Sequence, residues 1–352
     1  MIAEQIKIIL GKEHHSKDDI DVLSTYFEKY HEGIDGKEWA EWICKIDHIV
    51  AASGSDFDTV AFIERAYKEY AANNKRLFSH QGNILKHLCK LYIQRGNRED
   101  AIKTMRKYMY CMLADEAKQE RDYSQHYFSF RSFSEHSLKD IKEETISVAH
   151  PRTFNDPLDT LMYWWLDSKI KSIPSGNDIE DEFYIMMKKV TEHIKLRCLI
   201  SAKGRDVTGL SVLMWSHYAK NHTGFCIEYE LPEMHFDSLD SANDGLKMLK
   251  DIQYIDSVTV KDEPTIMQAL FQKTKEWEYE KEIRLAVYNP SNDAEFPTFE
   301  CPGCVKAIYL GVKCSDSDRH SMEKAIGDKC IPLFQMVIDN ENAGKFKKIR
   351  IG

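Results

Sequence analysis

Acids whose spacing could support chemistry lie in residues 277–285, which read Trp-Glu-Tyr-Glu-Lys-Glu-Ile-Arg-Leu. We expect strand character here, so Glu280 and Glu282 point to one face, because side chains alternate along a strand. In a cleft, two carboxylates would stabilise positive charge that develops on a substrate, such as a ribose C1′ that loses its leaving group. The alternative is an exposed strand whose acids form salt bridges with Lys281 and Arg284.

A second candidate is the stretch 213–230, where a polar, aromatic-rich segment ends at a glycine and an apolar strand follows. Ser216, His217 and Tyr218 offer hydroxyl groups, an imidazole and an aromatic ring within three residues. Such a set belongs either to a functional site or to a buried polar cluster, and the residue types leave both interpretations open.

Arg131 is a lone arginine among the aromatic residues of the segment 127–133. A guanidinium group can hold a diphosphate or a carboxylate through two parallel hydrogen bonds. It could equally close an internal ion pair, for which Asp156 and Asp159 are the candidates.

The sequence predicts neither a metal site nor a disulfide. His217 and His222 are five residues apart and have no third ligand at the usual spacing. A CxxC is followed by two cysteines without that spacing, so zinc is disfavoured at this set: Cys301, Cys304, Cys314 and Cys330. We expect the nine scattered cysteines to be reduced thiols of a cytoplasmic protein. Dinucleotide-fold, phosphate-loop, serine-hydrolase and zinc-protease motifs are all absent.

Composition narrows the class of protein. The chain has 352 residues with a hydrophobic content of 43%, which is enough for two or three domains with real cores. The net charge of −9 does not indicate a nucleic-acid partner, although a local basic groove remains compatible with it. No apolar run approaches the length that spans a membrane, and the N-terminus lacks a signal-peptide core.

The elements that must position these residues fall into two regions. From 20 to 110 the apolar spacing is helical, and two helices are expected to meet at Gly96, with the small residues Cys89 and Ala101 where they cross. This pattern resembles a tetratricopeptide repeat, although Tyr108 stands where that family has a small residue. Residues 1–120 are therefore interpreted as a helical module that binds or senses a protein partner, and an unrelated helical bundle is the alternative.

Residues 121–352 mix strands and helices without strict alternation, so we expect an α+β domain that carries the site. The expected strands are 127–132, 145–149, 196–202, 224–230, 252–256, 283–288, 305–311, 333–338 and 347–351. The expected helices are 158–170, 179–194, 207–219, 263–275 and 317–326. Between them, Pro157 fixes a turn that contains Asn155 and Asp156.

Four motifs within residues 127–311 resemble a bacterial family catalogued as domain of unknown function twenty-nine-seventy-one. They are Phe154-Asn155-Asp156-Pro157-Leu158-Asp159, then Leu199-Ile200-Ser201, then Met214-Trp215-Ser216-His217-Tyr218-Ala219 with Gly224–Glu228, and finally Trp277-x-Tyr279-Glu280-x-Glu282-x-Arg284. Because family motifs tend to gather at one site, the resemblance implies that Trp215, Asn155 and Asp156 lie near Glu280. Members look like effectors in phage-defence settings, some with helical-repeat extensions.

The order of an early arginine, a hydroxyl motif and Glu-x-Glu opening a strand looks like the ADP-ribosyltransferase plan. By that resemblance Arg131 would bind the diphosphate side of NAD, and Ser216 with His217 would support the nicotinamide ribose. Tyr218 would stack on nicotinamide. Glu282 would dominate bond cleavage, and Glu280 would activate an acceptor. The usual middle motif lies on a strand, which makes Ser201 a rival of Ser216.

Two functions from different classes follow. The first is an NAD-consuming effector, either an ADP-ribosyltransferase with a macromolecular acceptor or an NAD glycohydrolase, acting in bacterial phage defence. The second is a non-enzymatic binding or scaffold protein whose polar motifs fix loops. A nuclease ranks last, because the sequence lacks a constellation of metal-binding carboxylates.

Overall fold

The computed structural model describes residues 2–29, 36–53, 57–73, 78–117, 126–156, 158–201, 206–231, 246–257, 266–290 and 298–352. The chain forms two compact units. One comprises residues 1–118, 165–192 and 236–246, and the other comprises 119–164, 193–235 and 247–352. The boundary expected between residues 120 and 121 falls outside the described residues. None of the described helices is long and apolar enough to cross a membrane.

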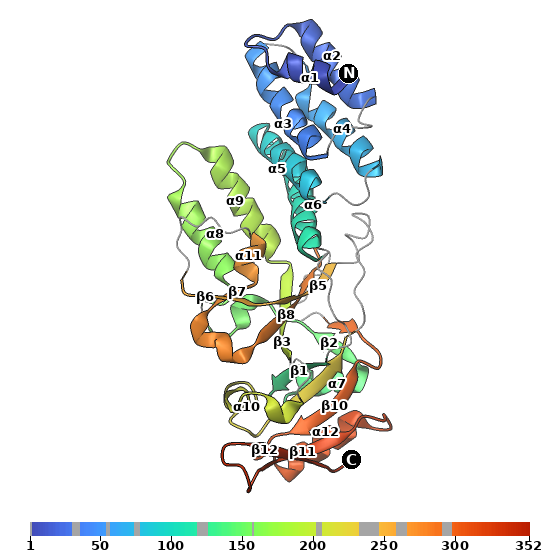
Figure 1. Cartoon of the computed structure of the whole chain (residues 1–352), viewed down its shortest axis with the longest axis vertical. Coiled ribbons are helices and arrows are strands. Elements are labelled where there is room, and N and C mark those ends of the chain that lie inside the picture. Colours follow the sequence, from blue (N-terminus) through green and yellow to red (C-terminus); the bar gives the residue numbers. More distant parts are fainter. Residues whose placement is uncertain are drawn as a thin grey trace. The chain divides into compact units, whose positions relative to one another are not determined.

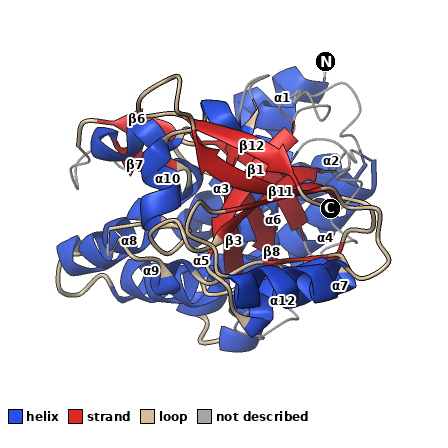
Figure 2. Ribbon diagram, turned by 90° about the horizontal axis from the view of Figure 1, so that it is seen from below, coloured by secondary structure: helices blue, strands red, loops and turns tan. Residues whose placement is uncertain are grey.

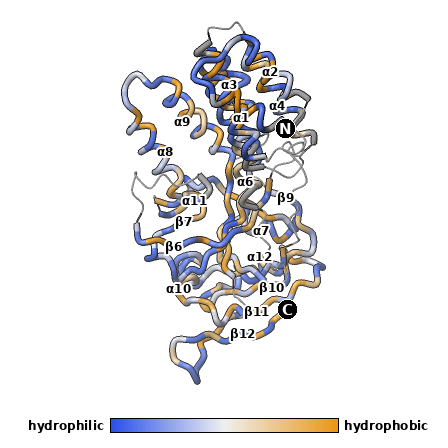
Figure 3. The backbone as a smooth tube through the Cα atoms, turned by 45° about the horizontal axis from the view of Figure 1, so that its top comes forward, coloured by the Kyte–Doolittle hydropathy of each residue, from blue (hydrophilic) through white to orange (hydrophobic). Residues whose placement is uncertain are grey.

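The first unit is helical. Its first six helices are α1 (Ile2–Leu10), α2 (Lys17–Lys29), α3 (Gly36–Ser53), α4 (Thr59–Asn73), α5 (Phe78–Gln94) and α6 (Arg98–Ala117) (Figure 1). No strand occurs among the described residues before 118, which confirms the helical prediction for that part. Hydrophobic and hydrophilic stretches alternate along α2 and α3 in Figure 3, as expected of helices that bury one face.

Helices α5 and α6 form the hairpin that the sequence predicts. Gly96 has a φ of +73° and ends α5, and the Asn97 amide donates a 2.9 Å hydrogen bond back to the Tyr92 carbonyl. The Cys89 thiol lies 3.4 Å from the Ala101 carbonyl oxygen, so the helices cross closely at the two small residues. The predicted turn and crossing point are both confirmed.

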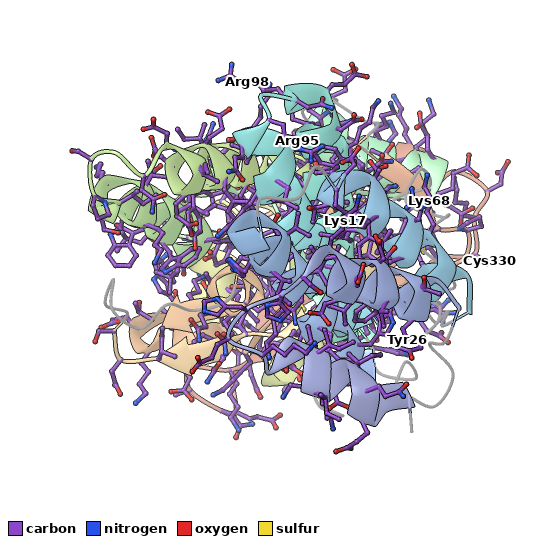
Figure 4. The ribbon with its side chains drawn as sticks, turned by 90° about the horizontal axis from the view of Figure 1, so that it is seen from above. Lys17, Tyr26, Lys68, Arg95, Arg98 and Cys330 are labelled. Carbon is purple, nitrogen blue, oxygen red and sulfur yellow. The ribbon has the colours of Figure 1, made fainter. Side chains whose placement is uncertain are left out.

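A helix from the later part of the chain also packs in this unit. Helix α9 (Asp178–Thr191) contacts α5 and α6, and it lies beside α8 (Leu161–Ser172). The Phe183 ring lies 6.2 Å from that of Tyr108, and the Lys90 ammonium lies 2.5 Å from the Glu180 carboxylate. Arg98, labelled in Figure 4, lies 3.3 Å from the Glu182 carboxylate.

The second unit contains an eight-stranded sheet in the order β12-β11-β10-β4-β1-β3-β8-β5. Its strands are β1 (His126–Arg131), β3 (Ile194–Ser201), β4 (Phe225–Glu230), β5 (Leu246–Asp251), β8 (Glu282–Tyr288), β10 (Val305–Leu310), β11 (Leu333–Ile338) and β12 (Phe346–Arg350). Helix α12 (Asp316–Ile326) joins the parallel pair β10 and β11, whereas β12–β11, β10–β4, β4–β1, β1–β3 and β3–β8 pair antiparallel. The α+β prediction is therefore confirmed.

Two two-stranded sheets complete the unit. They pair β2 (Thr145–Ser147) with β9 (Thr298–Glu300), and β6 (Gln253–Ile255) with β7 (Gln272–Thr274). Further helices are α7 (Glu135–Glu143), α10 (Val212–His217), α11 (Ile266–Leu270) and the 3₁₀ helices Pro151–Thr153, Val207–Gly209 and Lys275–Glu280.

The eight-stranded sheet has a hydrophobic cluster on each face, because neighbouring residues of a strand point to opposite sides. Tyr127 and Ile227 belong to the cluster that α7 and α12 cover, and these two helices lie beside each other in Figure 2. Phe128 and Ile200 belong to the other cluster, to which α10 contributes Trp215. Side chains on the two faces are therefore in different surroundings.

Three sequence predictions about elements need correction. The helix expected at 207–219 is two short helices, because Asp206 and Ser211 each cap a separate helix start through a side-chain oxygen. Of the helix expected at 263–275, the described part is α11 followed by β7. The strand expected from Trp277 begins only at Glu282, because residues 275–280 form a 3₁₀ helix that ends at left-handed Lys281.

Candidate functional site

A gap between β1 and β3 in the second unit defines the site. The registered pairs of these strands are Tyr127–Ser201 and Phe128–Ile200. Further along β3, Leu196 instead exchanges two backbone hydrogen bonds of 2.9 and 2.8 Å with Ala149. Between these two anchor points, β1 and β3 have no registered pair among the described residues. The strands therefore separate there.

A pocket of about 320 Å³ occupies this region. Its volume is at the lower end of the range for ligand pockets. Five residues that the sequence singled out line it: Asn155, His217, Tyr218, Glu280 and Glu282. The polar or charged residues that line it in addition are Ser129, Thr153, Asp159, Arg197, Cys198 and Lys273. The pocket thus brings together residues of three motifs that are distant in the sequence.

Strand β8 positions the first half of the charged cluster. Glu282 and Arg284 are two residues apart on one strand and share a face with Ile200 and Cys198, their registered partners on β3. Arg284 is fully buried, and its Nε donates to Glu282 Oε1 at 2.6 Å. Its Nη2 donates to both carboxylate oxygens of Asp159, at 2.5 and 2.7 Å. This charge-assisted pairing fixes both carboxylates.

Lys273 of β7 extends the cluster to Glu280. Its ammonium group donates to Glu280 Oε2 at 2.6 Å and to Glu282 Oε2 at 3.1 Å, and it lies 3.6 Å from an Asp159 carboxylate oxygen. The same nitrogen lies 4.6 Å from the centre of the Trp277 ring, within range of a cation–π contact. Tyr218 donates its hydroxyl hydrogen to Glu280 Oε1.

The charges of this cluster do not balance. Three carboxylates, on Asp159, Glu280 and Glu282, face two cationic groups, on Lys273 and Arg284. The five side chains are at most 6% exposed, so water screens the excess negative charge poorly. The exposure expected of Glu280 and Glu282 under the alternative is therefore wrong, whereas its ion pair between Glu282 and Arg284 is present. The cluster can take up a proton or stabilise a positive charge.

The pKa values of the acids diverge in response. Burial raises the pKa of Glu280 and of Asp159, because it disfavours their charged forms. Burial acts in the same direction on Glu282, but the charges of Arg284 and Lys273 outweigh it and hold the pKa of Glu282 at about 2. Glu282 is therefore the permanently ionised member, and Glu280 is better suited to exchange a proton.

Arg131 lies on the other face of the sheet. It pairs in register with Phe225, whose face is opposite to the one that carries Glu282. Its guanidinium group donates to the Asp140 carboxylate and, at 3.4 Å, to the Ser147 hydroxyl. Arg131 thus forms an internal ion pair, as the sequence allowed, but its partner is Asp140 and not Asp156 or Asp159. It does not line the pocket.

The remaining sequence candidates lie near the pocket but do not line it. Trp215 is buried and packs edge-to-face on Phe130 at a centroid distance of 4.9 Å. Ser216 Oγ lies 2.9 Å from His222 Nε2, and Asp156 accepts the Leu158 amide hydrogen at 2.9 Å.

The rival Ser201 is buried at the registered end of β3 and does not line the pocket. Pro157 lies outside the described residues.

Two charged residues of the pocket were missed by sequence reasoning. Lys273 fell inside a stretch expected to be helical, and Arg197 was an ordinary residue of an expected strand. Asp159 and Arg284 each belong to one of the four family motifs. A carboxylate in one motif and a guanidinium in another can form an ion pair, and this complementarity is the signal that could have predicted their contact.

The cysteines are all free thiols. Cys301 and Cys304 occupy the two ends of a turn whose Gly303 has a φ of +70°, and the Cys304 amide donates to the Cys301 carbonyl at 3.2 Å. Cys330 is exposed (labelled in Figure 4). Within the described ranges, no three His, Cys, Asp or Glu side chains are placed to hold a metal ion.

One comparison bears on this site. Residues 214–285 match the family described as Protein of unknown function (DUF2971). The matched segment carries Tyr218 and four of the five members of the charged cluster, which are Lys273, Glu280, Glu282 and Arg284. Neither a curated protein nor a solved structure is similar enough to this chain to match it. The family match therefore supports the C-terminal resemblance and names no activity.

Proposed function

We propose that the pocket cleaves the bond between nicotinamide and the ribose C1′ of NAD, as a glycohydrolase or an ADP-ribosyltransferase. The observation that carries the proposal is the buried cluster in which three carboxylates face two cations. As this bond breaks, positive charge moves from the pyridinium ring to the ribose, so a fixed carboxylate near C1′ stabilises the oxocarbenium-like transition state more than the ground state.

The reaction divides between the two glutamates. When the C1′–N bond breaks, its electron pair goes to the nicotinamide nitrogen, so nicotinamide leaves neutral and C1′ becomes positively charged. Glu282, held by Arg284 and Lys273, stays ionised and supplies the stabilising charge. Glu280 takes the proton of the water or acceptor group that adds to C1′. Its pKa is raised by burial, which brings it nearer to the operating pH of a general base.

Two residues near the glutamates would support these separate roles. Tyr218 donates to Glu280 and orients its carboxylate, and it stands beside the pocket where a nicotinamide ring would stack. His217 is exposed and lines the same pocket, so it is placed to contact the ribose or the acceptor. The order of Tyr218 before Glu280 and Glu282 is also part of what the likeness to ADP-ribosyltransferases implies, although the early arginine of that plan, Arg131, does not line the pocket.

The helical unit is proposed to bind a protein partner that controls this activity. The α5–α6 hairpin, with its close crossing at Cys89 and Ala101, is similar to a tetratricopeptide repeat in the order of its large and small residues. The family resemblance adds bacterial phage defence as the setting, with a macromolecule as the acceptor in the transferase case.

Nicotinamide release from NAD by the purified chain tests the proposal. We expect Glu282→Gln to lower kcat by at least about a hundredfold, because it removes a charge that acts in the transition state. Glu280→Gln should slow transfer to water or acceptor and leave the KM for NAD nearly unchanged. Glu323→Gln on α12, an exposed acid paired with Arg319, serves as the matched control and should behave as wild type. Equal rates in wild type and Glu282→Gln would exclude the assignment.

One observation favours the non-enzymatic alternative. Tyr218, Lys273 and Arg284 all donate to acids of the cluster, and a polar network with its partners in place also serves to hold loops in a unique arrangement. Under that reading, NAD binds without release of nicotinamide, or does not bind at all. Calorimetric titration of the full chain with NAD measures binding, and the release assay measures cleavage. Together they distinguish an enzyme from a protein that only binds NAD and from one that does not bind it.

A further inference from the structure

A second charged cluster, of opposite sign, lies behind the gap between β1 and β3. Arg131 and Arg197 share a single buried carboxylate, Asp140, with which Arg131 is in contact and from which Arg197 Nη2 is 3.9 Å distant. Asp140 also accepts hydrogen bonds from the hydroxyls of Thr145 and Ser147, at 3.1 and 2.6 Å. Two guanidinium groups therefore face one carboxylate, and one positive charge is left over.

Arg197 has hydrogen-bonding capacity to spare. Its Nε donates to the Ser147 carbonyl at 2.7 Å and its Nη2 to the Ser147 hydroxyl at 2.5 Å. Within the described part of the chain, its Nη1 has no hydrogen bond or ion pair. The side chain is 18% exposed, and Arg197 lines the pocket. Burial together with the charge of Arg131 lowers the pKa of Arg197 to about 10, which is the response of a cation short of counter-charge.

The pocket thus carries opposite charges on its walls. Glu280, Glu282 and Asp159 bring an excess of negative charge on one side. Arg197, whose side chain points to the opposite face of the sheet from Glu282, borders the pocket at the gap between β1 and β3 and brings an excess of positive charge there. A ligand that neutralises both must carry a cation and an anion at once. A guanidinium with a free Nη1 is suited to a phosphate or carboxylate oxygen.

We infer that the pocket recognises a phosphorylated pyridinium riboside, with the phosphate on Arg197 and the cationic ring and ribose against the acidic cluster. This inference rests on the proposed function and narrows it to the nicotinamide mononucleotide half of NAD. The pocket volume of about 320 Å³ suits this half better than a whole dinucleotide. The adenosine half then contributes little to the contacts inside the pocket.

The test compares two ligands that differ only in the phosphate. Calorimetry on the full chain measures the Kd of nicotinamide mononucleotide and of nicotinamide riboside. We expect wild type to bind the mononucleotide about tenfold or more tightly than the riboside, because one charge-assisted contact is added. In Arg197→Gln this preference should disappear while the Kd of the riboside stays the same.

Two further variants keep the experiment decisive. Arg197→Lys keeps the charge and loses the planar fork, so its preference should fall severalfold below that of wild type. If circular dichroism shows that Arg197→Gln is misfolded, the ligand preference of Arg197→Lys decides the test instead. Arg319→Gln, at an exposed arginine of α12, is the matched control and should keep the full preference.

The inference is overturned if wild type binds the two ligands equally, or if Arg197→Gln and Arg197→Lys keep the wild-type preference. Its failure is distinct from failure of the proposed function. If the chain releases nicotinamide from NAD but shows no phosphate preference, the proposed activity is supported and the phosphate site at Arg197 is excluded. If the phosphate preference depends on Arg197 but no nicotinamide is released from NAD, the phosphate site is supported and the proposed activity is excluded.

Discussion

Glu280 and Glu282 are two residues apart and both buried, yet their electrostatic surroundings differ. Glu282 contacts both Arg284 and Lys273, whereas Glu280 contacts only Lys273 of these two cations. The same substitution at the two positions should therefore have unequal effects on stability.

We predict that Glu282→Gln lowers the free energy of unfolding by about 3 kcal/mol, because it breaks the buried ion pair with Arg284 and weakens the contact with Lys273. Glu280→Gln should change it by less than about 1 kcal/mol in either direction, since Lys273 keeps Glu282 at 3.1 Å and Asp159 at 3.6 Å. Urea unfolding of both variants at neutral pH measures the difference. Equal losses would show that the ion pair with Arg284 does not distinguish the two acids.

The pKa shifts predict a pH dependence with a definite sign. The pKa of Glu280 is higher in the folded chain than its ordinary value, so the folded state binds this proton more tightly than the unfolded state does. The contribution of Glu280 to stability should therefore increase as the pH falls through its raised pKa. Glu282 acts in the opposite direction, and its contribution is lost only as the pH approaches about 2.

Thermal unfolding at pH 8 and pH 5 checks this prediction. Wild type should gain stability relative to Glu280→Gln on going from pH 8 to pH 5, because the variant has no proton to take up at this position. A constant difference between the two proteins across this range would contradict the raised pKa of Glu280.

Not every contact of these residues could be read from the sequence. The acids were recognised by their spacing, and the resemblance to a family drew Tyr218 and His217 into the same site. The choice of ion-pair partners was not predictable. Arg131 pairs with Asp140, and Asp159, which had been considered for it, pairs with Arg284. Such choices depend on which strands become neighbours, and the residue types of a single chain do not encode that directly.

At the scale of elements, Gly224 connects the α10 loop to β4 where two backbone segments nearly touch. A Cβ placed on it would lie 2.2 Å from the Arg131 carbonyl oxygen, well inside any permitted contact. Three consecutive left-handed residues, Lys220 to His222, precede it and set the direction in which the chain enters the strand.

We predict that Gly224→Ala destabilises the protein by about 3 kcal/mol, since the clash is with backbone and no rotamer change can relieve it. Gly82→Ala in α5 is the matched control. Its new methyl would meet only side-chain atoms at 3.7 Å or more, and alanine should raise stability by up to about 1 kcal/mol. Chemical unfolding of the two variants provides the comparison, and a similar effect at both sites would refute the role of Gly224.

Strands whose apolar residues follow a simple period could be predicted from the sequence. The division of one stretch into two separately capped helices could not. The strands at β1, β4, β8 and β10 follow a period of two or a buried apolar run, which the sequence displays plainly. The stretch 207–219 looked continuous because its apolar residues keep helical spacing. Its division depends on Asp206 and Ser211 accepting backbone hydrogens, a local competition that spacing does not reveal.

At the scale of the whole molecule, the helical unit is built from separate parts of the chain. Helix α9, encoded well after the first strand of the sheet, packs on α5 and α6. Phe183 of α9 is fully buried in this arrangement. A chain cut near residue 120 would therefore separate α9 from its packing partners.

We predict that residues 1–120 and residues 121–352, produced as separate chains, are each less soluble than the full chain and bind more of a dye that reports exposed apolar surface. Mixing the two parts should restore part of the loss. Gel filtration and dye fluorescence make the measurement. Two fragments that are each monomeric, and bind no more dye than the full chain, would show that α9 is dispensable for the helical unit.

Helix α9 also sets an order of events during synthesis. Residues 1–118 leave the ribosome before residues 165–192 have been translated, so α5 and α6 must wait for the helix that covers them. At about 5–20 residues per second, the 74 residues that separate 118 from 192 correspond to a delay of roughly 4 to 15 seconds. During that interval the growing chain presents an apolar surface to the cell, and it does so before Glu280 and Glu282 of the pocket have been made.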